Sequence, residues 1–239
     1  MRSETLNRGE LLTLKNLNVW YTKGRPVLDQ FSMELRTNEV VGLIGLNGAG
    51  KTTLIKTLAG LIDSFQVDTA LWQGEPLSFR DREFKKERYV VFAEDHSFRF
   101  FTFREYLSYV GTSYGKKLTG PEVEELVQGF HFDKYTDVLL KDLSMGNLKK
   151  AYLITAFALK PRFLMLDEPV NGLDFQSTEY LYQLISSYRQ YGTLLFSSHI
   201  LESICLTSDR VFVLEHGQIG QCFAGQEIEA ENIREALEK

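Results

Sequence analysis

The most informative feature of this sequence is a short glycine-rich segment that ends in lysine and threonine. Residues 45–52 read Gly-Leu-Asn-Gly-Ala-Gly-Lys-Thr and match the pattern G-x-x-x-x-G-K-[ST]. In such a loop the glycines let backbone N–H groups surround phosphate oxygens, and the following helix adds the positive end of its dipole. Lys51 can then reach the β- and γ-phosphates, while the Thr52 hydroxyl can ligate Mg²⁺. We therefore predict a nucleoside triphosphate site that is formed by Gly45, Leu46, Asn47, Gly48, Ala49, Gly50, Lys51, Thr52 and Thr53.

Two adjacent carboxylates follow a second apolar run. The residues Phe-Leu-Met-Leu at positions 163–166 precede Asp167 and Glu168. On its own this pair is also compatible with an ordinary turn after a strand. Combined with the phosphate loop, it predicts a catalytic site in which Asp167 completes the Mg²⁺ shell and Glu168 orients or deprotonates the attacking water.

The elements that must hold these side chains are three predicted strands. Residues 40–44 lead into the phosphate loop, residues 163–166 lead to Asp167, and residues 193–197 lead to His199. In open α/β sheets, ligands bind beyond the carboxyl ends of the strands. We therefore expect all three strand ends to meet at one site.

The remaining hydrophobic periodicity predicts an α/β body that is interrupted by helices. Further strand-like runs cover residues 11–44, 88–93 and 210–214, and helical runs cover residues 105–110, 121–130, 148–159, 177–191, 200–205 and 226–239. We expect a single domain over residues 1–239 with a mostly parallel core sheet and an N-terminal antiparallel β part. Its α/β body spans residues 1–94 and 160–225, its helical subdomain about 95–159, and its C-terminal helix about 226–239.

Composition excludes several other classes of protein. The 239 residues are 44% hydrophobic and 25% charged with a net charge of −5, as expected for a globular protein without a basic nucleic-acid-binding surface. We find no uninterrupted apolar run approaching the roughly 20 residues of a transmembrane helix, and no signal peptide. The sequence therefore predicts a cytoplasmic protein that acts at a membrane only through another polypeptide. Cys205 and Cys222 are expected to be unpaired thiols.

With these motifs in order along nearly the whole chain, the sequence resembles the ATP-binding subunits of ABC transporters. Residues 143–147, Leu-Ser-Met-Gly-Asn, resemble the family's L-S-G-G-Q sequence, and Lys150 matches a basic position just after it. The resemblance implies that Ser144 and Gly146 contact the γ-phosphate held by an opposing subunit. Met145 and Asn147 depart from the family's pattern, as exporter members often do.

The resemblance also assigns roles to three residues outside these motifs. Asp174 is similar to the residue that crosses the dimer interface, and His199 resembles the histidine that contacts the γ-phosphate. A surface histidine is the alternative interpretation for position 199. Tyr21 lies where the family places an aromatic ring against adenine, and Trp20 is the alternative if the register differs by one residue.

Glu94 occupies the position at which the family usually has a Mg²⁺-coordinating glutamine. Glutamate occurs there in exporter-like branches, but the following loop is about one residue shorter than the family's pattern, so the alignment of Glu94 stays open. The aromatic run at 98–106 lies where the family receives a helix of the membrane subunit. The alternative is that these rings fill the core of the helical subdomain.

The resemblance therefore implies an ATPase that uses ATP and Mg²⁺ to drive an exporter, most similar to the ABC-2-type branch. Its expected partners are an integral membrane permease subunit and a second ATPase subunit in a homodimer or heterodimer, with no nucleic acid. The expected location is the cytoplasmic face of the cell membrane, held there by the permease. An importer subunit and a soluble regulatory ATPase are the alternatives.

Overall fold

The computed structural model describes residues 9–238, and its strands form two sheets. Residues 1–8 and 239, which the expected domain and its C-terminal helix include, lie outside the described part. The first sheet is antiparallel in the order β2-β1-β5-β6, and β4 also pairs with β1. Its strands are β1 (Glu10–Thr22), β2 (Arg25–Arg36), β4 (Phe65–Gln66), β5 (Thr69–Trp72) and β6 (Glu75–Pro76).

The second sheet is mostly parallel and has the order β11-β10-β3-β9-β8-β7. Only the edge strand β11 runs antiparallel to its neighbour. Its strands are β3 (Val40–Ile44), β7 (Arg88–Val91), β8 (Phe163–Asp167), β9 (Thr193–Ser198), β10 (Arg210–Glu215) and β11 (Gln218–Ala224). This arrangement of a mostly parallel sheet beside an antiparallel sheet agrees with the predicted architecture.

Strands β3, β9 and β8 are neighbours in this sheet, so the three predicted strand ends do converge. Ile44 is paired with Ser198, and Asp167 with Ser197. Each of these strands is buried on both faces because its alternate side chains enter two different cores. In β3, for example, Val40 and Ile44 face one core and Val41 and Leu43 face the other.

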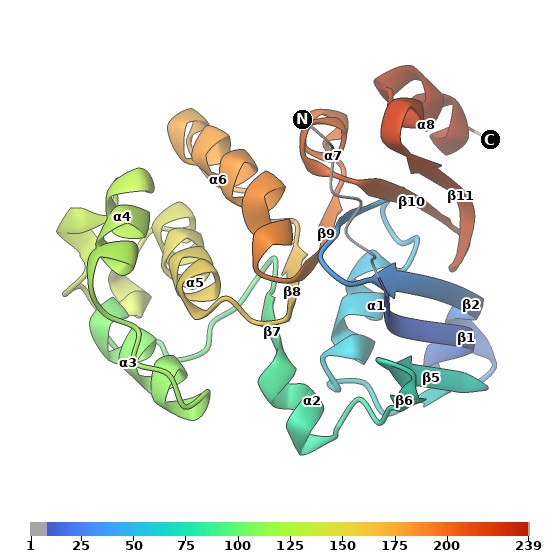
Figure 1. The fold of residues 1–239 in the computed structure, drawn as a ribbon, viewed down its shortest axis with the longest axis horizontal. Helices are drawn as coiled ribbons and strands as arrows, with labels where there is room; N and C mark the ends of the chain where they lie inside the picture. Colours follow the sequence, from blue (N-terminus) through green and yellow to red (C-terminus); the bar gives the residue numbers. More distant parts are fainter. Residues whose placement is uncertain (1–8, 239) are drawn as a thin grey trace.

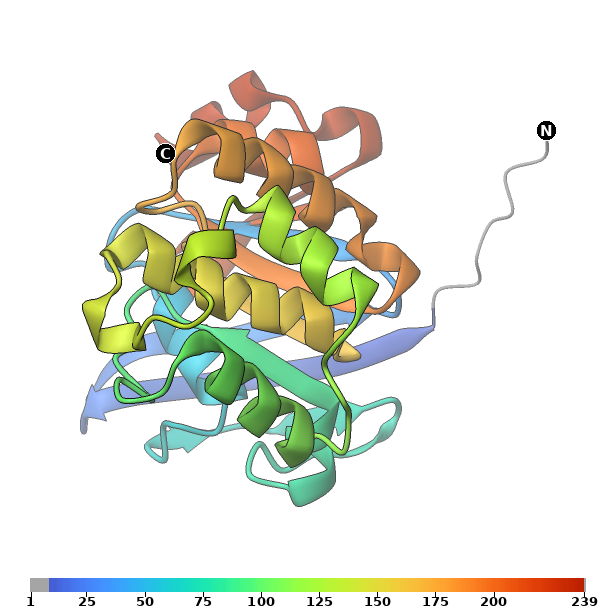
Figure 2. The same cartoon turned by 90° about the vertical axis from the view of Figure 1, so that its left-hand side faces the viewer.

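Helices cover both faces of the parallel sheet. α1 (Lys51–Leu58) contributes Leu54, Ile55 and Leu58 to the core that the two sheets share. Helices α3 (Phe103–Ser113), α4 (Pro121–Gly129) and α5 (Met145–Leu159) group on one side of the molecule, away from β1 and β2 (Figure 1). Figure 2 shows these three helices in front of the strands. The other helices are α2 (Arg82–Glu87), α6 (Phe175–Ser187), α7 (Leu201–Thr207) and α8 (Ala230–Leu237).

The predicted element boundaries differ from the structure in several places. The strand expected over 88–93 ends at Val91, and the helix expected over 177–191 ends at Ser187 and continues as a 3₁₀ turn. In the tail, a 3₁₀ turn precedes a helix that is shorter than expected, and β4, β5, β6, β11 and α2 were not predicted. Among residues 9–238, no helix is long and apolar enough to cross a membrane.

Candidate functional site

The phosphate loop connects β3 to α1 with a backbone that only glycine adopts easily. Gly48 and Gly50 have positive φ angles of 85° and 111°. A side chain at Gly45 would overlap the carbonyl oxygen of Leu214, and a Cβ at Gly50 would lie 2.7 Å from Leu28 Cδ2. The loop therefore has the bare backbone that lets N–H groups approach a phosphate closely.

Lys51, the first residue of α1, folds its side chain back over this loop. Its Nζ donates hydrogen bonds to the carbonyl oxygens of Gly45 at 2.6 Å and of Leu46 at 3.4 Å. Burial lowers the pKa of Lys51, whereas the carboxylates of Glu168 and Asp167 act in the opposite direction. A buried ammonium that is bound to the loop and feels the charge of two carboxylates suits a site for a phosphate and a cation.

Asp167 is the buried acceptor of the site. The Thr52 hydroxyl lies 3.1 and 3.0 Å from its two carboxylate oxygens, and the Ser197 hydroxyl donates to Oδ1 at 2.7 Å. Asp167 is only 1% exposed. Within residues 9–238 no group of three His, Cys, Asp or Glu side chains could hold a metal ion. The oxygens of Thr52 and Asp167 nevertheless fit Mg²⁺, which is commonly bound by one or two carboxylates together with substrate phosphates.

Glu168 and His199 lie side by side at the ends of β8 and β9. The His199 Nδ1 is 2.8 Å from Glu168 Oε2, and the Glu168 N–H donates to the Ser197 hydroxyl at 2.9 Å. Glu168 has a positive φ of 47°, a conformation that is uncommon for residues other than glycine. An ionised carboxylate only accepts, so Nδ1 is then the protonated ring nitrogen. This contact places the two predicted catalytic residues together.

The first turn of α5 packs against the loop that precedes α6. The Ser144 hydroxyl caps α5 by accepting from the Asn147 N–H at 3.3 Å. Lys150 Nζ and Asp174 Oδ2 form an ion pair at 2.6 Å, and Asp174 caps α6 by accepting from the Ser177 N–H at 2.9 Å. Burial would raise the pKa of Asp174, but the hydrogen bonds from Lys150 and Ser177 lower it well below its ordinary value. These contacts hold the segments of Ser144 and Asp174 together.

Met145 and Gly146 differ sharply in their surroundings. Met145 is 73% exposed on the first turn of α5. Gly146 packs so closely on Gly172 that a Cβ at position 146 would overlap the Gly172 carbonyl oxygen. The predicted contact residue Gly146 is therefore also a packing residue.

Replacement of Gly146 by alanine tests this close packing. Because the neighbouring atom is backbone, we expect the Gly146→Ala variant to lose about 1–3 kcal/mol of unfolding free energy, measured by denaturant titration. Gly9→Ala is the matched control, because nothing lies within 4 Å of a Cβ at that position, and we expect less than about 0.5 kcal/mol of change. Equal stabilities for the two variants would contradict the packing argument.

Tyr21 lies against the first turn of α1. Its hydroxyl lies 3.4 Å from the Thr53 hydroxyl, and the side chain is 61% exposed. Trp20, the alternative, is half-buried, and neighbouring strand residues point to opposite faces. The geometry favours Tyr21 over Trp20, and its stacking on adenine stays a prediction.

Glu94 is exposed on the segment that follows β7. This segment and α5 line a cavity of about 170 Å³ whose wall includes Glu94, Asp95, Met145 and Lys149. Burial lowers the pKa of Lys149 to about 8, and the nearby carboxylates act in the opposite direction. Glu94 therefore shares a cavity with the first turn of α5, and its metal contact stays a prediction.

Two side chains that hold the site together were not predicted. Ser197 bridges Asp167 and Glu168, and Lys149 holds the segment before Glu94. The sequence contained a signal for Ser197, because this residue ends a predicted strand whose carboxyl end is expected at the site. Lys149 had none, since a lysine beside a second lysine in the first turns of a helix is ordinarily assigned to solvent.

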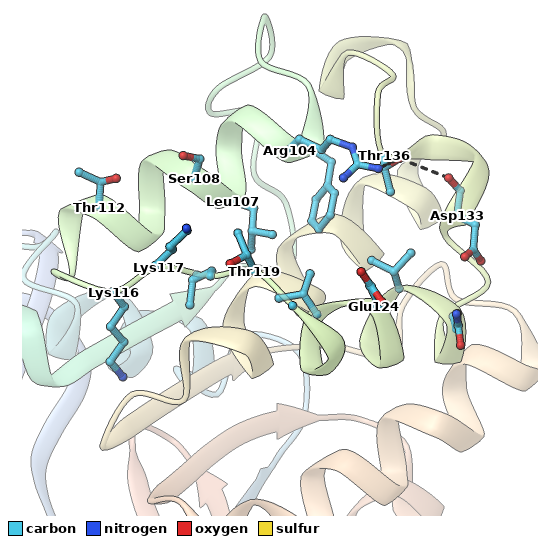
Figure 3. Close-up of a pocket in the computed structure, with 16 residues that line it drawn as sticks. Arg104, Leu107, Ser108, Thr112, Lys116, Lys117, Thr119, Glu124, Asp133 and Thr136 are labelled. Atoms are coloured by element: carbon cyan, nitrogen blue, oxygen red, sulfur yellow. Dashed lines mark hydrogen bonds between the residues drawn. The ribbon is translucent and has the colours of Figure 1, made fainter.

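The aromatic run at 98–106 divides between core and surface. Phe103 and Tyr106 are buried, whereas Phe98 and Phe100 are 37% and 77% exposed. Phe103 and Tyr106 therefore belong to the core of the helical part, and contact of the exposed rings with a membrane subunit stays a prediction. A separate hollow of about 620 Å³ lies between α3 and α4, lined by Arg104, Lys117 and Glu124 among others (Figure 3). None of the predicted nucleotide residues lines it, so it is distinct from the phosphate loop.

Comparison with known proteins supports one family. Residues 28–171 match the family described as ABC transporter. AlbC of Bacillus subtilis (strain 168), named as an ABC transporter ATP-binding protein, is 36% identical over 217 residues that cover 87% of this chain and 90% of AlbC. The chain belongs to the ABC transporter family.

Other members of the family resemble the chain over most of its length. The cobalt import ATP-binding protein CbiO of Salmonella typhimurium is 32% identical over 220 residues, which cover 86% of this chain and 79% of CbiO. A solved ATP-binding subunit of an ABC transporter has a TM-score of 0.83 at 25% identity, covering 96% of this chain and all of that one. The predicted family and fold class are confirmed. This ABC transporter ATP-binding subunit is an ATPase that hydrolyses ATP to power transport.

Proposed function

We propose that this ABC transporter ATP-binding subunit drives an exporter by closing head to tail on a second subunit. The second subunit is another copy of the chain or a related ATPase. The observation that carries the proposal is the exposed first turn of α5. Ser144 is exposed there beside Met145, which is 73% exposed, while Lys51, Asp167 and Glu168 gather at the strand ends. A site divided in this way is completed when the α5 turn of one subunit covers the phosphate loop of the other.

The roles of the residues follow from their atoms. Lys51 Nζ exchanges its loop carbonyls for phosphate oxygens, and Thr52 and Asp167 hold Mg²⁺ together with Glu94. Bound Mg²⁺ supplies positive charge that neutralises the phosphates in the transition state. Glu168 accepts a proton from the attacking water, and His199 orients that carboxylate through their 2.8 Å contact. Ser144 donates its hydroxyl to the γ-phosphate in the opposite site.

The membrane partner is proposed to dock on the aromatic run. Phe98 and Phe100 of this run are exposed by 37% and 77%, and Arg99 beside them is exposed too. Tyr109 of α3, which is 49% exposed, packs against Phe98 with ring centroids 5.1 Å apart. Exposed aromatic side chains with arginine at their edge are enriched in protein interfaces. Through this contact the subunit would be peripheral to the cytoplasmic face of the membrane.

An importer subunit is the second candidate. Its support is the 32% identity with CbiO, whose name is that of a cobalt import protein. Export is supported by Glu94, Met145 and Asn147, because exporter members of the family often depart from the usual residues at these positions.

Purification of the tagged chain from its native cells in mild detergent tests the proposal. We expect an integral membrane protein to co-purify in near-equal amount, and its topology will help to decide between export and import. A second ATPase in the same complex would indicate a heterodimer. Recovery with soluble partners only would contradict the transporter proposal and favour a regulatory ATPase.

A further inference from the structure

The segment that carries Glu94 is held by helix α5. It leaves the parallel sheet where β7 ends at Val91. Lys149 Nζ donates hydrogen bonds to the carbonyl oxygens of Phe92 at 2.7 Å and of Ala93 at 2.8 Å. The Tyr152 hydroxyl donates to the carbonyl oxygen of Ser97 at 3.0 Å. Carbonyl groups on both sides of Glu94 are therefore bound by side chains from one helix.

Both donors are removed from solvent. Lys149 is 4% exposed and Tyr152 is 3% exposed. Burying an ammonium group is costly unless it is paired and hydrogen-bonded, and here two backbone carbonyls supply the hydrogen bonds. Such a group resists displacement, because loss of the carbonyls would leave a buried charge without partners. The contact is therefore suited to fix the position of a loop.

The same part of α5 also holds the other loop of the site. Lys150, the residue after Lys149, forms the 2.6 Å ion pair with Asp174, and Gly146 packs on Gly172. The first two turns of α5 thus join the exposed turn at Ser144 to the Asp174 loop through Lys150 and to the Glu94 segment through Lys149. Movement of α5 would be transmitted to both loops.

We propose that Lys149 is a positioning residue that fixes the Glu94 segment to helix α5. The segment then follows α5, rather than the sheet, when the helical part and the sheet move relative to each other. Lys149 touches neither the nucleotide nor the metal and acts by placing the Glu94 carboxylate. Tyr152 contributes the second attachment at Ser97. The inference rests on the proposed role of Glu94 in holding Mg²⁺.

Magnesium affinity measured without turnover is the direct readout. The full-length chain is saturated with a non-hydrolysable ATP analogue, and Mg²⁺ is titrated by calorimetry. Lys149→Met keeps most of the side-chain volume and removes the donors, so we expect Mg²⁺ affinity to fall about tenfold, as for other residues that orient a metal ligand. With ATP as substrate, kcat should fall about tenfold while KM for ATP changes less than about twofold. Lys149→Arg should restore most of the Mg²⁺ affinity.

Tyr152→Phe provides a variant that keeps the ring and removes only the hydroxyl. It should shift Mg²⁺ affinity in the same direction as Lys149→Met but by less, and it keeps the inference testable if Lys149→Met does not fold. Lys160→Met is the matched control, because Lys160 lies at the opposite end of α5 and pairs with Glu122. We expect its Mg²⁺ affinity to equal that of the unmodified chain.

A double variant separates this inference from the proposed role of Glu94. If Lys149 acts through Glu94, then Glu94→Ala combined with Lys149→Met binds Mg²⁺ no more weakly than Glu94→Ala alone. If the loss of Mg²⁺ affinity in the double variant equals the product of the losses in Glu94→Ala and Lys149→Met, the inference is wrong. It is also wrong if Mg²⁺ affinity is unchanged in both Lys149→Met and Tyr152→Phe. Unchanged affinity in Glu94→Ala would instead overturn the metal-binding role of Glu94, and with it the action of Lys149 through that residue.

Discussion

Replacement of Lys51 by alanine is expected to weaken ATP binding at least about 100-fold. The buried ammonium donates to two loop carbonyls at 2.6 and 3.4 Å, the place where phosphate oxygens would be bound. Charge-assisted hydrogen bonds contribute about 1.5–3 kcal/mol each, and two such bonds to phosphate correspond to at least two orders of magnitude in affinity. The measurement is an equilibrium titration of the purified chain with ATP.

The control for this prediction lies on the same helix. Lys56 is the basic residue of the last turn of α1, and Lys56→Ala should bind ATP as the unmodified chain does. Thermal unfolding of both variants shows whether the fold is intact. Unaltered ATP affinity in a folded Lys51→Ala variant would contradict the assignment of residues 45–53 as the nucleotide site.

The sequence predicted those parts of the site that lie at the ends of regular, buried strands. β3, β8 and β9 are buried on both faces, so each contains a continuous apolar run; β3 leads into the phosphate loop, and β8 and β9 end at Asp167 and Ser198. Because parallel strands end at one edge of a sheet, the convergence of the phosphate loop, Asp167 and His199 followed from the strand assignments alone.

The elements that were not predicted are those that pairing partners determine. β4 and β6 each have two residues and exist only because β1 and β5 supply their hydrogen bonds. The 3₁₀ turn that ends α6 has a similar origin, because Tyr188 is 1% exposed and its hydroxyl donates to the Pro161 carbonyl at 2.7 Å. β11 also depends on its partner, since its side chains alternate in burial beside β10 although Gln-Ile-Gly-Gln-Cys-Phe-Ala does not alternate between polar and apolar residues.

Lys149 shows why side-chain roles within a correctly predicted helix are harder to obtain. A helical pattern assigns lysine to the solvent, yet Lys149 is 4% exposed because the segment after β7 covers it. That segment has no regular structure, and its path depends on contacts from residues more than 50 positions away. Tertiary contacts of this kind leave no periodic signal in the chain.

Replacement of Glu168 by glutamine is expected to lower the ATPase rate about 100-fold or more while leaving ATP binding intact. A general base contributes about 10²–10⁴-fold to rate, and glutamine has almost the same size but cannot accept the proton from water. The glutamine oxygen can still accept from His199 Nδ1, which lies 2.8 Å from Glu168 Oε2. The loss should therefore appear in kcat and not in the affinity for ATP.

Three measurements on this variant distinguish a chemical role from a structural one. The ATPase rate is followed with the membrane partner bound, the ATP affinity is measured by titration, and the association of subunits is measured with and without ATP. Glu179→Gln, an exposed residue of α6, is the matched control and should hydrolyse ATP at the unmodified rate. Since Glu168→Gln binds ATP without consuming it, the proposed closed dimer should accumulate in this variant. An ATPase rate equal to that of the unmodified chain would show that Glu168 is not the general base.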